Sequence, residues 1–274
     1  MSGVILALLE RPAAAVAVLA AARRSAQLMG ATRINVLAVR TPPMDILSAS
    51  EGLITLPVMG SDSGTEDTRI AALRDIFQAW ASSEAPGNLA AEWMSVEGWP
   101  DQVVDDWGER ADLIVLQRPG APASEAERRA VHAALFDTGR PVLVVPQDSE
   151  AETFGQRVVV AWRDDSRTLN AVLGALRWLS GAAETHVIAG TRRWESTPEL
   201  PEIFTEHGVD AQLHVLPMAG QRAFGEALLA RAHELDADLI VLGAFAHPML
   251  FGPLLGSVTK HLLANADMPV LMRY

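Results

Sequence analysis

The chain has 274 residues, of which 49% are apolar, with a formal net charge of -12 and no cysteine. This length allows one large domain or two ordinary ones, and the apolar share is enough to build a sizeable core. The absence of cysteine excludes disulfides, cysteine-based zinc sites and a cysteine nucleophile, and the acidic balance argues against nucleic acid or an anionic membrane as a general partner.

No segment reaches the roughly 18 consecutive apolar residues of a membrane-spanning helix. The alanine-rich stretch 13–22 comes closest, and arginines lie close to both of its ends. The apolar run 4–9 has no basic residue before it and is followed by Glu10, which is not the pattern of a signal peptide. Together with the missing cysteines, these features predict a cytoplasmic protein.

The first half opens with the apolar run 4–9, and the β-branched runs 35–39 and 112–116 predict strands. Residues 71–82 have the apolar spacing of a helix. The segment Thr41–Gly64 breaks this alternation, because it is long for a connection and rich in proline, serine and glycine. Segments of this kind are typically lids, partner surfaces or mobile loops, and we interpret this one as a mobile or variable insertion.

The second half alternates regularly between short apolar runs and amphipathic stretches. Strands are expected at 158–162, 185–190, 211–216, 238–242 and 269–272, and helices at 166–180, 198–208, 222–236 and 256–266. Short unbroken apolar strands separated by helices indicate a parallel sheet that is covered on both faces. The predicted fold class is therefore α/β and doubly wound.

The chain also repeats itself. ADLIVLQ at 111–117 recurs as ADLIVLG at 237–243, and each copy precedes a loop, a helical stretch and a further apolar run. Such self-similarity predicts a duplication. We expect two tandem doubly wound domains, each an open, mostly parallel five-stranded sheet flanked by helices, at 1–147 and 156–274, with a polar linker between them.

The second repeat leads into a loop with glycine at both ends. Residues 243–257 spell GAFAHPMLFGPLLGS, between an expected strand and an expected helix. Ligands of open α/β sheets lie beyond the carboxyl ends of the strands, and a helix N-terminus favours an anion such as phosphate. Glycine would let the phosphate approach the backbone, and Ser257 could donate its hydroxyl group to it. On spacing alone, an equal alternative is that Ser257 caps its own helix and the glycines only turn corners.

Several familiar sites are excluded. Gly256 is not followed by the Lys-Ser/Thr of a Walker A loop, and no G-x-G-x-x-G opens either half. The seven histidines lack the spacing of metal ligands, and Ser257 has no nucleophile-elbow context. We therefore predict no catalytic residue and no metal ligand.

Gly243, Ala246 and Gly256–Ser257 are separated by two and by nine residues. This spacing resembles that of the universal stress protein family, whose ATP-binding members carry a second glycine where this chain has Ala246. If the chain turns there with positive φ, an alanine costs about 1 kcal/mol. The resemblance covers nearly the whole chain as tandem domains, with its motif strong only in the second.

The resemblance implies that the second domain binds an adenine nucleotide. The stretch VVVAWRDDSRT resembles the family's first strand and turn, where an acidic residue meets the adenosine, and Val187 matches a position that lines the adenine pocket. His247 lies inside the loop, although a lone loop histidine is more often solvated. The implied ligand is ATP, with or without Mg²⁺. The predicted binding residues are Ala161, Trp162, Asp164, Val187, Gly243, Ala246, His247, Gly256, Ser257 and Val258.

The first half departs from this pattern. After ADLIVLQ its loop and helix are two residues shorter than in the second half, and Arg129 stands where Ser257 would be. We expect this domain not to bind ATP in the family's manner. Its expected role is to pack against the second domain as a built-in dimer partner, and a homodimer of whole chains is the default expectation.

Three functions stay open at this point. The first is a tandem universal stress protein, a cytoplasmic ATP-binding or ATP-responsive stress module with at most slow ATP hydrolysis. The second is a scaffold that binds no nucleotide and acts through its surface, including the insertion Thr41–Gly64. The third, an adenylating ATP pyrophosphatase, ranks last because AWRDDSRT lacks the glycines of the loop that such enzymes carry after the first strand.

Overall fold

The computed structural model describes residues 3–42, 44–49, 52–57, 63–83, 89–120, 122–147, 149, 153–192, 196–218, 220–244, 246–247 and 254–274. The first half contains β1 (Gly3–Leu8), α1 (Pro12–Met29), β2 (Ala31–Arg40), β3 (Met44–Ala49), β4 (Gly52–Pro57), α2 (Ser63–Ser83), β5 (Ala90–Glu97), α3 (Pro100–Gly108), β6 (Leu113–Gln117), α4 (Glu125–Phe136) and β7 (Val142–Val145). The second half contains β8 (Arg157–Trp162), α5 (Ser166–Leu179), β9 (Glu184–Thr191), α6 (Glu202–Glu206), β10 (Ala211–Pro217), α7 (Gln221–Glu234), β11 (Leu239–Gly243), β12 (Ala246–His247), β13 (Leu254–Leu255), α8 (Ser257–Asn265) and β14 (Val270–Arg273).

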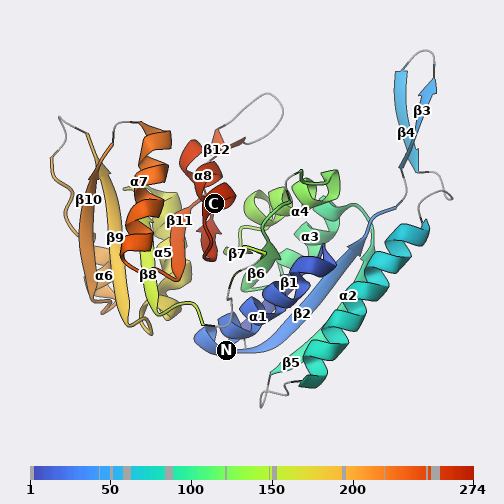
Figure 1. Cartoon of the computed structure of the whole chain (residues 1–274), viewed down its shortest axis with the longest axis horizontal. Helices are drawn as coiled ribbons and strands as arrows, with labels where there is room; N and C mark the ends of the chain where they lie inside the picture. The colour runs from blue at the N-terminus through green and yellow to red at the C-terminus, as the bar shows by residue number, and fades with distance from the viewer. Residues whose placement is uncertain are drawn as a thin grey trace.

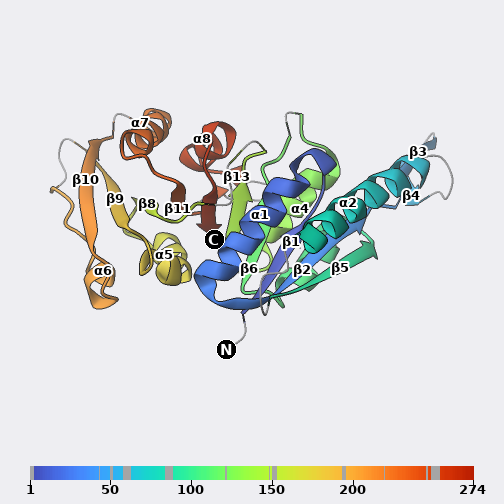
Figure 2. The same ribbon diagram turned by 60° about the horizontal axis from the view of Figure 1, so that its bottom comes forward.

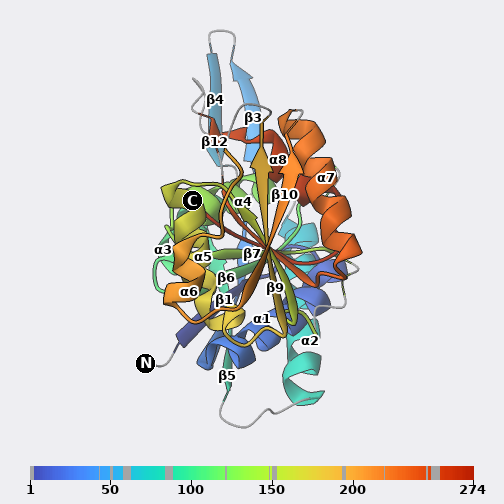
Figure 3. The same ribbon diagram turned by 90° about the vertical axis from the view of Figure 1, so that its left-hand side faces the viewer.

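Ten of these strands form one continuous sheet, in the order β10-β9-β8-β11-β14-β7-β6-β1-β2-β5 (Figure 1). Within each half of this sheet neighbouring strands are parallel, and the strand orders of the halves, β5-β2-β1-β6-β7 and β10-β9-β8-β11-β14, are equivalent. Figure 3 looks along the sheet from its β10 end and shows the fan of a twisted sheet. The predicted α/β, doubly wound fold class is confirmed.

The halves meet where β7 and β14 pair antiparallel, with Leu143 opposite Leu271. Both leucine side chains are fully or almost fully buried in the same core cluster. Beside this seam, Arg118 donates from its guanidinium group to the carbonyl oxygen of Ala266 at 2.7 Å, at the end of α8. A hydrogen bond from the first half therefore satisfies a carbonyl group at the C-terminal end of α8, in the second half. The predicted domain limits, 1–147 and 156–274, stay a prediction.

Helices cover both faces of the sheet. One core cluster joins α1, α2, α5 and α6 to alternate strand residues, and the other joins α3, α4, α7 and α8 to the residues between them. Figure 2 shows α7 and α8 on one side of the second-half strands and α5 and α6 on the other. This alternation explains why the central strands are apolar at every position, since each face of the sheet needs its own core.

Two expectations need correction, and some elements were not expected. The insertion Thr41–Gly64 is not merely a loop, because β3 and β4 pair with each other as an antiparallel hairpin that projects from the body (Figure 1). The helix expected at 198–208 is only Glu202–Glu206: Pro201, with ψ 135°, delays its start, and Gly208, with φ 68°, follows its end. The strand β5 and the helices α1 and α3 were also not predicted from the sequence.

Among the described residues, no helix is long and apolar enough to cross a membrane.

Candidate functional site

The second half reverses its strand order between β8 and β11. The chain runs from β8 outward to β9 and β10, and then crosses back to β11 on the other side of β8. Such a switch point opens a crevice at the carboxyl ends of the strands, where ligands of this fold class bind. The end of β8 at Trp162, the end of β11 at Gly243 and the start of α5 at Ser166 all lie at this edge.

Gly243 has a packing role of its own. A Cβ atom at this position would lie 2.8 Å from the backbone nitrogen of Thr168 and 3.0 Å from the carbonyl carbon of Arg167. Both of these are backbone atoms in the first turn of α5, which cannot give way as a flexible side chain can. Glycine here lets α5 pack directly on the end of β11, whether or not a ligand is bound.

The loop between Gly243 and Gly256 folds back on itself. Ala246 and His247 form β12, which pairs antiparallel with Leu255 and Leu254 of β13. Extended backbone suits alanine, so β12 gives no reason to expect strain from Ala246. Residues 245 and 248–253 of the predicted motif lie outside the described residues.

The start of α8 is bare. Its N-cap is Gly256, with φ -61° and ψ 157° and no side-chain cap, and the first bond within the helix runs from Lys260 N to Gly256 O. The N–H groups of Ser257, Val258 and Thr259 therefore have no partner inside the helix. This is the donor arrangement that an anion requires. Positive φ does not explain Gly256, because its backbone conformation is open to any residue.

Ser257 does not cap α8. Its hydroxyl group donates to Oε1 of Gln221 at 2.9 Å, and Gln221 is the first residue of α7, whose N-cap Gly220 also lacks a side-chain cap. The alternative in which Ser257 serves its own helix is therefore wrong for this structure. The hydroxyl links the starts of two helices at the edge where the predicted ligand would lie.

Two buried threonines were missed from the sequence. Thr168 and Thr259 are the third residues of α5 and α8, both are almost fully buried, and the Oγ1 atoms of both lack a hydrogen-bond partner within the described part of the chain. A buried hydroxyl group without a partner costs free energy. The only signal in the sequence is threonine three residues after each N-cap.

The residues predicted to contact the adenosine differ in exposure and in their partners. Asp164 is exposed, and its neighbour Asp165 is the N-cap of α5, accepting from Thr168 N at 3.0 Å and pairing with Arg163 at 3.2 Å. The half-buried Trp162 packs edge-on against the ring of Phe204, with 6.0 Å between centroids.

The remaining predicted residues lie toward the core. Val187 is fully buried in the cluster that contains α5 and α6. Ala161 and Val258 are partly buried and pack against the opposite cluster. The structure thus brings Gly243, Ala161 and Trp162 to one edge, with Val187 inside the sheet below it.

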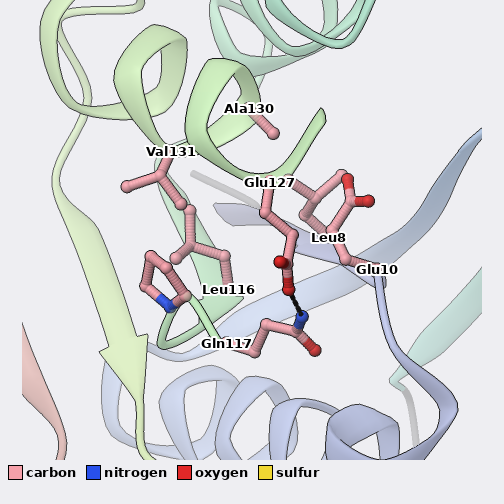
Figure 4. A pocket seen from close by; sticks show the side chains of 8 residues that line it. Leu8, Glu10, Leu116, Gln117, Glu127, Ala130 and Val131 are labelled. Carbon is pink, nitrogen blue, oxygen red and sulfur yellow. Dashed lines mark hydrogen bonds between the residues drawn. The ribbon is translucent and has the colours of Figure 1, made fainter. Parts of the chain in front are cut away.

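At the same edge of the first half, side chains that follow β1, end β6 and begin α4 line a small pocket (Figure 4). Gln117, which ends β6 as Gly243 ends β11, donates to Oε1 of Glu127 at 3.0 Å. Glu127 also pairs with Arg11 at 2.8 Å and closes a capping box with Ser124 at the start of α4. Burial raises the pKa of the nearby Glu10 from 4.5 to about 7. The start of α4, the counterpart of α8, is therefore capped by its own side chains.

Among the described residues, no group of His, Asp and Glu side chains is arranged to hold a metal ion.

The fold and this edge define a doubly wound α/β protein with a candidate anion site at its switch point. Residues 218–272 match the family model of the Universal stress protein family. The chain also resembles a solved universal stress protein from Archaeoglobus fulgidus DSM 4304, with a TM-score of 0.72 and 18% identity over 100% of this chain and 96% of that one. A functionally unknown protein from Pseudomonas aeruginosa PAO1 has a TM-score of 0.62 and 17% identity over 98% of this chain and 92% of that one.

No curated protein matches the sequence. The comparisons nevertheless confirm the resemblance that the sequence indicated. Residues 218–272 carry the sequence pattern of the universal stress protein family, and the whole chain has the fold of a solved universal stress protein.

Proposed function

We propose that the protein is a tandem universal stress protein, a cytoplasmic stress-response module whose second half binds ATP. The observation that carries this proposal is the bare start of α8, where three backbone N–H groups follow Gly256 without a side-chain cap. A phosphate at this position would satisfy donors that the helix itself leaves unpaired. The spacing from Gly243 to Gly256–Ser257 supports a nucleotide over other anions through the family resemblance.

The residues at this edge fit the phosphate end of such a ligand. Ser257, Val258 and Thr259 would offer backbone N–H groups next to Gly256, and Ser257 would turn its hydroxyl group from Gln221 to the ligand. The triphosphate supplies the negative charge that the helix start favours. Asp164 and Trp162, at the end of β8, are the candidates for contact with the nucleoside.

Binding, and not turnover, is the proposed activity. Of the two acidic residues at the start of α5, Asp165 is engaged as the N-cap and Asp164 is exposed, so neither is placed as a general base. Ligand binding would instead reorganise the loop between Gly243 and Gly256 and change the surface that a protein partner meets.

Titration calorimetry with Mg-ATP tests the proposal with two variants and one control. Gly256→Ala adds a methyl group where the backbone must approach phosphate, and the backbone conformation there tolerates alanine. Ser257→Ala removes the hydroxyl group. The control is Ser180→Ala, whose hydroxyl group bonds Leu176 O at the other end of α5. We expect weaker binding in the first two variants and none of that loss in the control.

The second candidate function is partner binding without a nucleotide. The hairpin β3–β4 favours it, because these strands pair with no other strand of the described chain and project from the body (Figure 1). Replacing residues 43–62 by a short glycine-serine linker separates the two functions. If this variant loses a protein partner but still binds ATP, the hairpin has a role in partner binding. If, in addition, the intact chain binds that partner equally with and without ATP, this candidate is favoured over the first.

A further inference from the structure

The start of α2 is fastened to the sheet by one arginine. Arg69 donates to the backbone carbonyl oxygen of Glu10, just beyond β1, at 2.8 Å and to that of Val39 in β2. It also binds the Glu66 carboxylate through two nitrogens, at 2.6 and 2.9 Å. Glu66 in turn accepts from Thr41 N at 3.0 Å. One side chain therefore connects α2, which follows the insertion, to the ends of two strands that precede it.

The same arginine faces a buried carboxyl group. The Glu10 side chain is 9% exposed, and its Oε2 lies 3.9 Å from Nη1 of Arg69. Its other oxygen, Oε1, is buried without a hydrogen-bond partner in the described part of the chain. At 3.9 Å the contact with Arg69 is too long for a hydrogen bond. Glu10 thus lies beside the arginine without the partners that a buried carboxylate needs.

The charges around Glu10 already balance without it. Arg69 and Glu66 face it from α2, Glu127 faces it from α4, and Arg11, at the start of α1, pairs with Glu127. Arg40, at the end of β2, also acts on Glu66 and pairs with Asp67 of α2, so three guanidinium groups oppose three carboxylates. A further carboxylate charge at Glu10 would be buried and unbalanced, which favours its neutral form.

We propose that Glu10 is a proton-operated latch that holds the start of α2, and with it the root of the insertion, against the sheet. With the carboxyl group protonated, Arg69 stays committed to Glu66 and to the two backbone carbonyl groups. With the carboxyl group ionised, the cluster carries an excess negative charge, and opening the start of α2 relieves it by admitting water.

The direction of the pH effect follows from linkage. In the closed state burial raises the pKa of Glu10 to about 7, whereas an open, solvated glutamate has the ordinary value of 4.5. The closed state therefore binds the proton more strongly, and opening becomes more favourable as the pH rises from about 4.5 to about 7. The gain is at most about tenfold per pH unit, and it levels off above the higher value.

Hydrogen exchange of the amides at 64–70, in the first turns of α2, tests the latch on the full chain. The protection factors, corrected for the intrinsic pH dependence of exchange, should fall by up to about tenfold per pH unit between pH 5 and 7 and then level off. Glu10→Gln keeps the side chain neutral, so its protection should not change with pH. The control is Glu125→Gln, which alters an exposed ion pair with Arg128 and should behave as the wild type does.

Two results would overturn the latch. One is a flat protection profile in the wild type between pH 5 and 7, and the other is a Glu10→Gln protein that keeps the wild-type pH dependence. If Glu10→Gln does not fold, carbon NMR of the Glu10 carboxyl group in the wild type decides the question. Titration near the ordinary value of a glutamate would then reject the proposal, and titration near neutrality in step with the exchange would support it.

Discussion

The two halves of the sheet differ at the edge where their strands end, in how the start of the following helix is capped. In the first half Gln117 ends β6 and reaches Glu127, which caps α4. In the second half Gly243 ends β11, and α8 starts at the bare Gly256. In the first half, side chains cap the start of α4, whereas the start of α8 has no side-chain cap among the described residues. This difference is the reason that we propose a ligand at the second edge.

The two edges can be compared directly because the strand that leads to each has the same sequence. ADLIVL precedes both Gln117 and Gly243, and both copies are buried strands in equivalent positions of the sheet. In this repeat the two copies differ first at the last strand residue, Gln117 or Gly243, at the edge where the fold class places its ligands. Substitutions at these residues can therefore break the comparison without disturbing the sheet.

Glu127→Ala should have the largest effect, because it breaks the closed edge. It removes a capping box, the ion pair with Arg11 and the acceptor of Gln117. We expect a loss of about 3 kcal/mol in the free energy of unfolding, measured by denaturant titration. A loss below about 0.5 kcal/mol, within the range of ordinary surface substitutions, would show that this network does not stabilise the first half.

Gly243→Ala should come next, because it drives a methyl group against the backbone of Thr168 and Arg167. Overpacking of this kind costs about 1–3 kcal/mol. The matched control is Gly64→Ala in α2, where an added Cβ meets nothing within 4 Å and alanine favours the helix. Equal stability of the two variants, measured by thermal unfolding, would contradict the packing role of Gly243.

The local stability of α7, in the second half, and of the start of α2, in the first, should change in opposite directions with pH. In the second half Arg231 donates to Nδ1 of His214, and Nε2 of His214 lies 3.1 Å from Nδ1 of His186. Burial, Arg231 and His186 lower the pKa of His214 below 6.5. The folded state then binds this proton less strongly than the unfolded state, so the stabilisation present above pH 6.5 is lost as the pH falls toward the lower, folded-state value.

Exchange of the α7 amides (Gln221–Glu234) between pH 7 and 5 checks this sign. Protection of α7 should fall with acid, whereas protection at the start of α2 should rise. His214→Gln, which cannot take up a proton in this range, should flatten the α7 response and leave α2 unchanged. A decrease in both regions on acidification would contradict the opposite signs.

Thr259→Val should have the smallest effect. Thr259 holds the third helical position of α8, as Glu127 does in α4, but its buried hydroxyl group has no hydrogen-bond partner in the described residues. Removing such a group is neutral or slightly stabilising, within about 1 kcal/mol. A large loss of stability in denaturant titration would mean that the hydroxyl group is satisfied, and the start of α8 would then be less open than we infer.

The sequence was sufficient for the parts of the fold that depend on local pattern. Buried strands such as 112–116 and 238–242 are unbroken apolar runs, and the repeat exposed the duplication. The contacts that decide the site are distant in sequence. Thr168 approaches Gly243 across the sheet, Gln221 meets Ser257 from another helix, and no local pattern encodes either contact.

The insertion and the latch were hidden for the same reason. An isolated two-stranded hairpin is only marginally stable, and the proline, serine and glycine content of 41–64 favoured a loop. Glu10 and Arg69 stand far apart in the chain, and only the fold makes them neighbours. The spacing from Gly243 to Ser257 could be recognised, but its ligand stays a prediction.

The most direct test of the difference between the two edges is the amount of nucleotide each chain holds. Small molecules released by heat denaturation of the purified protein can be identified by mass spectrometry, and Mg-ATP binding can be counted by calorimetry. We expect one adenine nucleotide per chain, lost in Gly256→Ala and retained in Gln117→Ala. An empty extract without heat on adding Mg-ATP, or two nucleotides per chain, would contradict a single open edge.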